Sequence, residues 1–154
     1  MPFHITPATP DDAPIVVDYN IALASETESK TLERATVEKG VRAVLGDSAK
    51  GRYFLARLSD GDEAGAVIGQ LMVTFEWSDW RNGMMWWVQS VYVRQDWRRR
   101  GVFRALFQHV VDVAKSEGVP VVRLYVEEHN GPARETYAAL GLEPTGYLVL
   151  ERPL

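Results

Sequence analysis

The sequence predicts an α/β fold of the mixed α+β kind, in which about four helices flank one central sheet. Short runs rich in valine and aromatic residues alternate with segments whose apolar residues recur every three or four positions. One helical segment lies between two strand-like runs, as in a right-handed parallel crossover, whereas the earlier runs follow one another as antiparallel strands do. The chain has 154 residues, of which 46% are hydrophobic, so we expect a single domain over residues 1–154.

The first half of the chain is expected to form a strand, two helices and a hairpin. Thr9 and Pro10 supply an N-cap and a first-turn proline for the first helix. Asp60 and Gly61 form a turn signal between two β-rich runs. The expected elements are a strand over 3–6, helices over 10–24 and 31–45, and strands over 53–58 and 66–75.

The second half is expected to continue the sheet through one crossover helix. From Gly101 to Gly118 the apolar residues fall on one side of a helix. Asn130 begins a second, shorter helix, which Gly141 stops. A polar insert over 76–83 separates the hairpin from the next strand. The expected strands cover 84–93, 121–126 and 147–150.

Composition excludes several classes of protein. There is no cysteine, so neither a disulfide nor a thiolate nucleophile is available, and a reducing cytoplasm is the expected location. The three histidines are far apart in sequence, and we expect no metal site. No apolar run approaches the roughly 18 residues that span a bilayer, and the net charge of −4 argues against binding to nucleic acid.

One basic cluster departs from this acidic average. Five arginines fall within the eleven residues from Arg94 to Arg104, where a strand is expected to turn into a helix at Gly101. Free backbone N–H groups at a helix start, surrounded by guanidinium groups, favour a bound phosphate. The loop is neither a Walker loop nor a GxGxxG turn, and solvated surface charge is the alternative interpretation.

A second pair of polar residues has a spacing of two helical turns. Asn130 and Tyr137 are seven residues apart, so both project from one side of the short helix. Each also has an ordinary structural interpretation, since Asn130 is a natural N-cap and a tyrosine often packs in a core.

Taken in order, these segments resemble the GNAT superfamily of N-acetyltransferases over essentially the whole chain. The matching segments are the strand end Val91-Tyr92-Val93, the loop Arg98-x-x-Gly101 with its helix, the strand at 121–126, and Asn130-x-x-Ala133-x-x-x-Tyr137-x-x-x-Gly141. One position departs from the family pattern, because Phe103 stands where a small residue is usual. We expect this to displace the helix slightly and to leave its amides available.

The resemblance implies acetyl-CoA as the acyl donor and assigns residues to it. The strand end would pair with the pantetheine arm, the loop amides would hold the pyrophosphate, Asn130 would contact the arm, and Tyr137 would lie beside the thioester sulfur. The implied cofactor-binding residues are Val91, Tyr92, Val93, Arg98, Arg99, Arg100, Gly101, Val102, Phe103, Arg104, Asn130 and Tyr137.

The implied reaction is direct attack of a primary amine on the thioester, through a tetrahedral intermediate. Tyr137, with an ordinary pKa near 10, can return a proton to the leaving thiolate. Many family members carry an acid near the reacting amine, but Gln89 occupies that position here. The candidate general bases are Glu28, which we favour, and Glu26 and Glu76.

The acceptor is left open by the sequence. The resemblance places Glu76 to Gly83 beside the acceptor cleft, where Trp77 and Trp80, with Glu76 and Asp79, would form a wall suited to a cationic amine. The alternative is that these tryptophans cover the core or a subunit contact. A polyamine, an amino acid, an aminoglycoside-like compound and a protein amine all remain candidates, and exposed tryptophans make a homodimer reasonable. The alternative function is a catalytically silent acyl-CoA-binding module or sensor.

Overall fold

The computed structural model describes residues 1–154, which divide into two compact units, Met1–Leu124 and Tyr125–Leu154. We call these the N-terminal and C-terminal units and describe each by itself. None of the helices combines the length and the apolar character that a bilayer-spanning helix requires.

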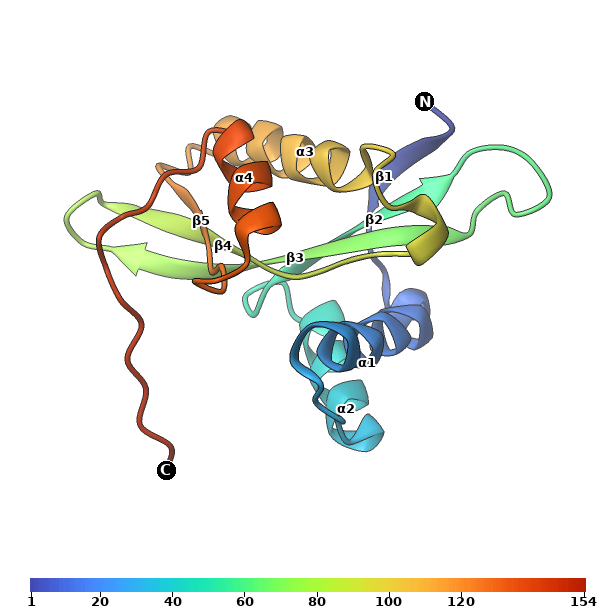
Figure 1. Cartoon of the computed structure of the whole chain (residues 1–154), viewed down its shortest axis with the longest axis horizontal. Coiled ribbons are helices and arrows are strands. Elements are labelled where there is room, and N and C mark those ends of the chain that lie inside the picture. The colour runs from blue at the N-terminus through green and yellow to red at the C-terminus, as the bar shows by residue number, and fades with distance from the viewer. The chain divides into compact units, whose positions relative to one another are not determined.

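The N-terminal unit contains a five-stranded sheet whose strands follow the order of the sequence, β1-β2-β3-β4-β5 (Figure 1). The first three pairings are antiparallel, and β4 and β5 pair in parallel through the crossover helix, which confirms the predicted mixed sheet. The strands are β1 (Phe3–Pro7), β2 (Arg52–Leu58), β3 (Val67–Ser78), β4 (Gly83–Val93) and β5 (Val122–Leu124).

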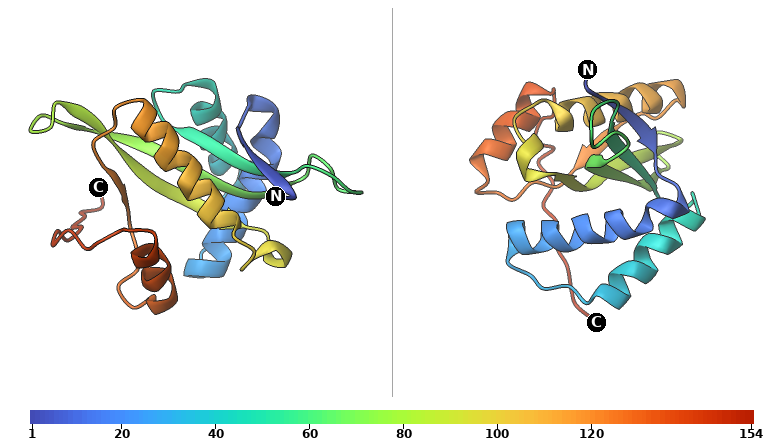
Figure 2. Two further views of the ribbon diagram at one scale, coloured as in Figure 1. Left: turned by 90° about the horizontal axis from the view of Figure 1, so that it is seen from above. Right: turned by 90° about the vertical axis from the view of Figure 1, so that its right-hand side faces the viewer.

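Helices cover both faces of this sheet (Figure 2). On one face lie α1 (Ala13–Glu28), which a 3-10 turn at Pro10–Asp12 precedes, and α2 (Arg34–Gly46). On the other face lies α3 (Val102–Ser116). The core under α1 and α2 is built from the fully or largely buried side chains of Val16, Val17, Tyr19, Val41, Tyr53, Leu55, Met72 and Tyr92.

The contact between α3 and β3 depends on one glycine. A Cβ atom at Gly69 would lie 2.9 Å from the Cγ1 atom of Val102 and 3.4 Å from the Cδ1 atom of Leu106. Val102 is the first residue of α3, and both apolar side chains are buried. The absent side chain of Gly69 therefore lets the start of α3 lie directly on the sheet.

A β-bulge interrupts β4 in its second half. The pairing with β3 passes from Met72 opposite Gln89 to Gln70 opposite Tyr92, so two residues of β4, Ser90 and Val91, face one residue of β3. Ser90 has a φ of +53°, a backbone conformation that is uncommon for residues other than glycine. The bulge changes which side chains of β4 face α1: Gln89 before it and Tyr92 after it.

Several boundaries differ from the prediction. The helix α1 continues to Glu28 rather than ending at residue 24, so the expected polar turn is largely the last turn of the helix. The strands β3 and β4 extend into the expected polar insert and leave only Asp79–Asn82 as the turn, because paired strands continue wherever their backbones can form a ladder.

The C-terminal unit contains one helix, α4 (Gly131–Ala139), and the prediction of a strand over 147–150 is wrong. Tyr147 and Leu150 are 77% and 90% exposed. A β-rich run becomes a strand only when another strand pairs with it, and the C-terminal unit contains no strand. Strand β5 is also shorter than expected, since pairing with β4 covers only three residues.

Candidate functional site

The loop before α3 presents backbone N–H groups to solvent. Gly101 is the N-cap of α3 and has a φ of +81°, and no atom lies within 4 Å of where its Cβ would be. No side chain caps this helix end. The N–H groups of Gly101, Val102, Phe103 and Arg104 precede the first intrahelical bond, which Ala105 donates to the Gly101 carbonyl. The loop therefore has both the space and the donors for a phosphate.

Two of the five arginines in the loop are engaged by the protein itself. Arg94 is ion-paired with Glu63 and Asp96, at 3.0 and 2.7 Å. Arg98 donates through Nε to the carbonyl oxygen of Val93 at 2.9 Å, and its Nη2 lies 3.1 Å from Glu26. These contacts tie the loop to its neighbours and use much of the hydrogen-bonding capacity of both side chains.

The other three arginines are exposed. Arg100 stacks on the ring of Trp97, with its Cζ 5.0 Å from the ring centroid. No carboxylate forms an ion pair with Arg99 or Arg104. Arg99 has a φ of +62°, which continues the turn into Gly101. The charge available to a bound anion at this helix start therefore comes from Arg99, Arg100 and Arg104.

The end of β4 has one backbone edge that no strand occupies. Strand β5 pairs with β4 only from Trp86 to Val88, so no strand lies beside Val91 and Val93 on the edge of β4 that faces away from β3. Tyr92 is buried beneath α1, and its ring lies 4.7 Å from that of Tyr19. Burial and the neighbouring Glu26 carboxylate raise the pKa of Tyr92. What this strand end can offer to a ligand is therefore its backbone.

Phe103, the departure from the family pattern, packs along its own helix. Its ring lies 5.9 Å from that of Phe107, one helical turn later, and it is partly buried. The side chain of Val102 is fully buried, so only its backbone faces the loop. The helix start remains intact with Phe103 in place.

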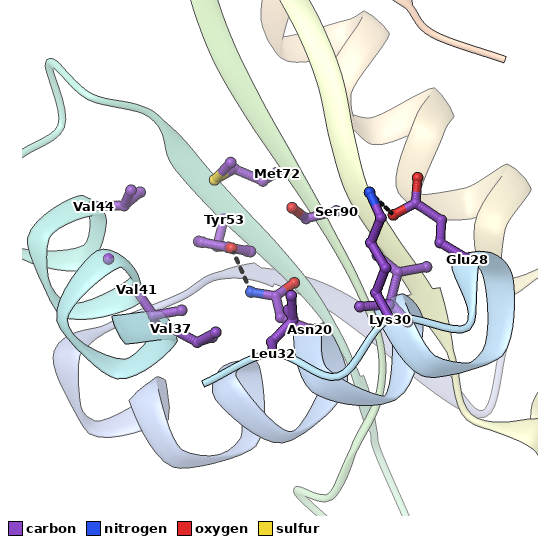
Figure 3. Close-up of a pocket in the computed structure, with 13 residues that line it drawn as sticks. Asn20, Glu28, Lys30, Leu32, Val37, Val41, Val44, Tyr53, Met72 and Ser90 are labelled. Carbon is purple, nitrogen blue, oxygen red and sulfur yellow. Dashed lines mark hydrogen bonds and ion pairs between the residues drawn. The ribbon is translucent and has the colours of Figure 1, made fainter. Parts of the chain in front are cut away.

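A cavity of about 410 Å³ lies between α1, α2 and the sheet (Figure 3). Its walls are mostly apolar and come from both helices and from β3. Three polar side chains, those of Asn20, Tyr53 and Ser90, line its inner part, and Glu28 and Lys30 lie at one side. The apolar lining consists of Leu23, Ala24, Leu32, Val37, Val41, Val44 and Met72.

A buried hydrogen-bond network supports the polar part of this cavity. Gln70 is fully buried and donates through Nε2 to the Asn20 Oδ1 atom at 2.9 Å and to the Ser90 carbonyl oxygen at 3.0 Å. Asn20 in turn donates to the Tyr53 hydroxyl at 2.9 Å. Burial raises the pKa of Tyr53, so this hydroxyl keeps its proton at neutral pH. The network thus joins α1, β2 and β3 to the bulge of β4.

The three candidate bases occupy different surroundings. Glu28 lines the cavity. Glu26 accepts hydrogen bonds from Gln95 and Arg98, which hold its pKa below the ordinary range. Glu76 faces Arg123, 3.4 Å away, and does not line the cavity. Of the three, only Glu28 is placed where it could reach a molecule in the cavity.

The two expected tryptophans are elsewhere. Trp77 and Trp80 are 58% and 89% exposed and lie at the turn end of the β3–β4 hairpin, and neither lines the cavity. Trp77 instead borders a separate hollow of about 600 Å³ with Arg52 and Trp86. The strands continue through residues 76–78 and place these tryptophans at the turn end of the hairpin, so a wall for an acceptor at Trp77 and Trp80 stays a prediction that concerns a place other than this cavity.

Asn130 and Tyr137 both belong to the C-terminal unit. Asn130 is the N-cap of α4 and accepts a hydrogen bond from the Ala133 N–H at 3.2 Å, as its structural interpretation predicts. Tyr137 lies seven residues later, two turns along the same helix, and is partly buried, and this burial raises the pKa of its hydroxyl.

The sequence did not reveal two features of the N-terminal unit. The bulge at Ser90 carries no glycine or proline that would mark it. The polar network depends on Asn20, Tyr53 and Gln70, which are far apart in the chain and are individually unremarkable. The one available signal was Gln70 itself, a polar residue within an otherwise apolar strand run.

Comparisons with known proteins agree with this architecture. Residues 19–142 match the model of the acetyltransferase (GNAT) family. The crystal structure of a possible acetyltransferase from Clostridium difficile 630 is 37% identical, covers 100% of this chain and 99% of its own, and has a TM-score of 0.91.

Two curated relatives match part of the chain. A thialysine N-epsilon-acetyltransferase from Bos taurus is 30% identical over 50% of this chain. An L-methionine sulfoximine/L-methionine sulfone acetyltransferase from Pseudomonas paraeruginosa is 31% identical over 65% of it. These matches cover 45% and 58% of the two relatives, about half of their length. The family match spans most of the chain, and the chain belongs to the GNAT acetyltransferase family.

Proposed function

We propose that residues 1–154 act as one N-acetyltransferase domain that uses acetyl-CoA to acetylate a primary amine. The observation that carries the proposal is the start of α3, where free amides, a left-handed Gly101 and three exposed arginines come together. A pyrophosphate fits this arrangement because it needs several donors and positive charge in an open turn. Membership of the acetyltransferase family supports the same ligand.

The proposed roles of the loop and of β4 follow from what each offers. The amides of residues 99–104 bind the pyrophosphate, with Arg99, Arg100 and Arg104 supplying charge. Arg98 uses its Nε and Nη2 atoms to hold the loop to Val93 and Glu26, so only part of its guanidinium group is available to a phosphate. The open backbone edge at Val91 and Val93 pairs with the pantetheine arm, because an unpaired strand edge accepts an extended amide-bearing chain.

When bound, acetyl-CoA supplies a thioester carbonyl that an amine attacks directly, giving a tetrahedral intermediate and then an amide and a free thiol. We propose that the amine enters the cavity between α1 and α2, beside the bulge at Ser90. Glu28 takes up the proton that the amine loses, directly or through water. The backbone N–H groups near the bulge stabilise the developing oxyanion.

Asn130 and Tyr137 keep the roles that the family resemblance assigns to them. Asn130 contacts the pantetheine arm, and Tyr137 donates a proton to the departing thiolate. Its raised pKa suits this role, since the hydroxyl remains protonated at neutral pH. Both relatives named above are acetyltransferases, which supports a small amine as acceptor.

A thermal unfolding scan with acetyl-CoA tests the cofactor. At a hundred times its dissociation constant a ligand adds about 2.7 kcal/mol to stability, which raises the midpoint by several degrees. ATP and dephospho-CoA serve as comparison anions. A rise specific to acetyl-CoA supports the proposal, and an equal rise with ATP would show a general anion site.

Matched variants test the loop. Replacing Arg99 and Arg104 with alanine should weaken acetyl-CoA binding about tenfold or more, since each loses a charge-assisted contact. Replacing Arg34 and Arg42, two exposed arginines on α2, removes the same charge and should leave binding unchanged. Release of CoA thiol in the presence of amines then separates the enzyme from a catalytically silent module that binds acetyl-CoA without turnover.

A further inference from the structure

We infer that the acceptor is an α-amino acid with an apolar side chain, held by Glu28 and Lys30 at one side of the cavity. The inference rests on the proposed function and specifies its acceptor. It is carried by the lining of the cavity, which combines one acid, one base and an otherwise apolar wall.

Glu28 and Lys30 are brought together by the end of α1. Ser29 has a φ of +52° and ends the helix, and the N–H of Lys30 then bonds back to the Ala24 carbonyl at 3.1 Å. This turn sets the Lys30 Nζ atom 3.8 Å from the Glu28 Oε2 atom (Figure 3). The side chains are 65% and 60% exposed, and a pair this open contributes little to folding. Both groups are therefore available to a ligand of matching charge.

The two charges match the two ends of an amino acid. The ammonium group of the acceptor faces Glu28, which also accepts the proton that the amine loses on reaction. The carboxylate group faces Lys30. A polyamine or an aminoglycoside-like compound carries several positive charges, but the cavity offers a single carboxylate and a lysine beside it. The charge pattern therefore selects a zwitterion over a polycation.

The rest of the cavity selects the side chain of that amino acid. Leu23, Leu32, Val37 and Val41 line it from the two helices, and Met72 lines it from the sheet. A charged side chain buried against these residues would lose its hydration without gaining a partner. The volume of about 410 Å³ lies in the range of small-molecule sites, roughly 300–1,000 Å³.

Acetylation rates for a matched set of amines test the inference. L-Leucine provides both charges and an apolar side chain, 3-methylbutylamine lacks only the carboxylate, L-glutamate carries a charged side chain, and spermidine is a polycation. We expect kcat/KM for L-leucine to exceed that for each of the other three by about tenfold or more. Equal values for L-leucine and 3-methylbutylamine would overturn the inference, as would a preference for spermidine.

Variants at position 30 separate recognition of the carboxylate from a general effect on the fold. Lys30→Met should raise KM for L-leucine about tenfold and change that for 3-methylbutylamine less than twofold, and Lys30→Arg should restore most of the loss. Lys39→Met removes an exposed lysine of α2 that does not line the cavity and should change neither value. Equal effects of Lys30→Met on the two amines would contradict the assignment.

Direct binding distinguishes failure of the inference from failure of the proposed function. Calorimetric titration of L-leucine into protein saturated with CoA needs no turnover. Binding that Lys30→Met weakens supports the inference even if no amine is acetylated, in which case the proposed reaction is wrong. Acetylation of other amines without L-leucine binding retains the proposed function and overturns the inference.

Discussion

Gly69 of β3 and Val102 of α3 approach so closely that a Cβ atom at Gly69 would lie 2.9 Å from the Val102 Cγ1 atom. Gly69→Ala should therefore destabilise the protein by about 1–3 kcal/mol, because a packed interior cannot absorb the added methyl group without moving α3. The move displaces the amides at the start of this helix, so acetyl-CoA binding should weaken as well. Urea unfolding and acetyl-CoA titration measure the two effects.

Gly46→Ala provides the matched control for this substitution. Gly46 is the last residue of α2, and a Cβ atom there would meet nothing within 4 Å. The change should leave stability unaltered or raise it by up to about 1 kcal/mol, since alanine favours the helix more than glycine does. If Gly69→Ala were as well tolerated as Gly46→Ala, the close packing of α3 on β3 would be disproved.

The ion pair between Asp12 and Arg57 should make stability depend on acid pH. Burial raises the pKa of Asp12, but hydrogen bonds from Arg57, at 2.6 Å, and from the Thr9 N–H, at 2.8 Å, outweigh it and leave the pKa below its ordinary value. A lowered folded-state pKa stabilises the protein above the unfolded-state pKa, and this contribution is lost as the pH falls through the folded-state value. Asp12→Asn should cost about 1–3 kcal/mol at pH 7 and progressively less below about pH 4.

The exposed pair of Asp18 and Arg34 is the control for this prediction. The two side chains are 54% and 59% exposed, so Asp18→Asn should change the free energy of unfolding by less than about 1 kcal/mol. Urea unfolding at pH 7 and at pH 2.5 compares the variants. A cost of Asp12→Asn that stays constant between these pH values would show that ionisation of Asp12 is not the cause.

The order of elements could be predicted from the sequence because it depends on local signals. Thr9 with Pro10, and Asn130 with Gly131, mark helix starts that the structure confirms to within about three residues. The lengths of β3, β4 and β5 could not be predicted, since pairing between distant segments decides them. The run at 147–150 has the composition of a strand but no strand with which to pair in its own unit.

The candidate site also has one part that could be predicted from the sequence and one part that could not. The loop at Gly101 is contiguous in sequence, so its glycine and arginines were recognisable together. The cavity draws Asn20, Tyr53 and Ser90 from three separate elements, and no spacing rule links them. The sequence suggested Trp77 and Trp80 as a wall of the acceptor cleft, but their place depends on how far the β3–β4 hairpin continues, which local sequence does not show.

Gln70→Leu should destabilise the protein by about 1–3 kcal/mol. The leucine cannot donate, so the Ser90 carbonyl and the Asn20 side chain each lose a buried hydrogen bond. Hydrogen exchange should accelerate at the amides of the bulge, which this side chain supports. Gln108→Leu, in which an exposed glutamine of α3 loses its bond to Asp112, should change stability by less than about 0.5 kcal/mol. Equal costs at the two positions would argue against a supporting role for Gln70.

Tyr137→Phe tests the proposed proton donor. The variant should lower kcat by about 10²- to 10⁴-fold and change KM for acetyl-CoA little, because only the proton transfer is lost. Burial raises the pKa of Tyr137 above its ordinary value of 10, so the native enzyme should lose no activity through this group until the pH exceeds about 10. Tyr147→Phe, at an exposed tyrosine of the same unit, should leave kcat unchanged. A Tyr137→Phe enzyme with native kcat would remove this residue from the mechanism.

The bulge at Ser90 acts as a one-residue frameshift in the alternation of β4. Before it, Gln89 shares the α1 face with Met72, and after it Tyr92 shares that face with Gln70. If the same sequence alternated regularly from Gln89 onward, with no bulge, Tyr92 would face α3, away from Tyr19, and Val93 would face α1. Deletion of one residue between Gln89 and Tyr92 would therefore remove the bulge and leave a regular strand with Tyr92 still on the α1 face, because the two residues would then be two positions apart.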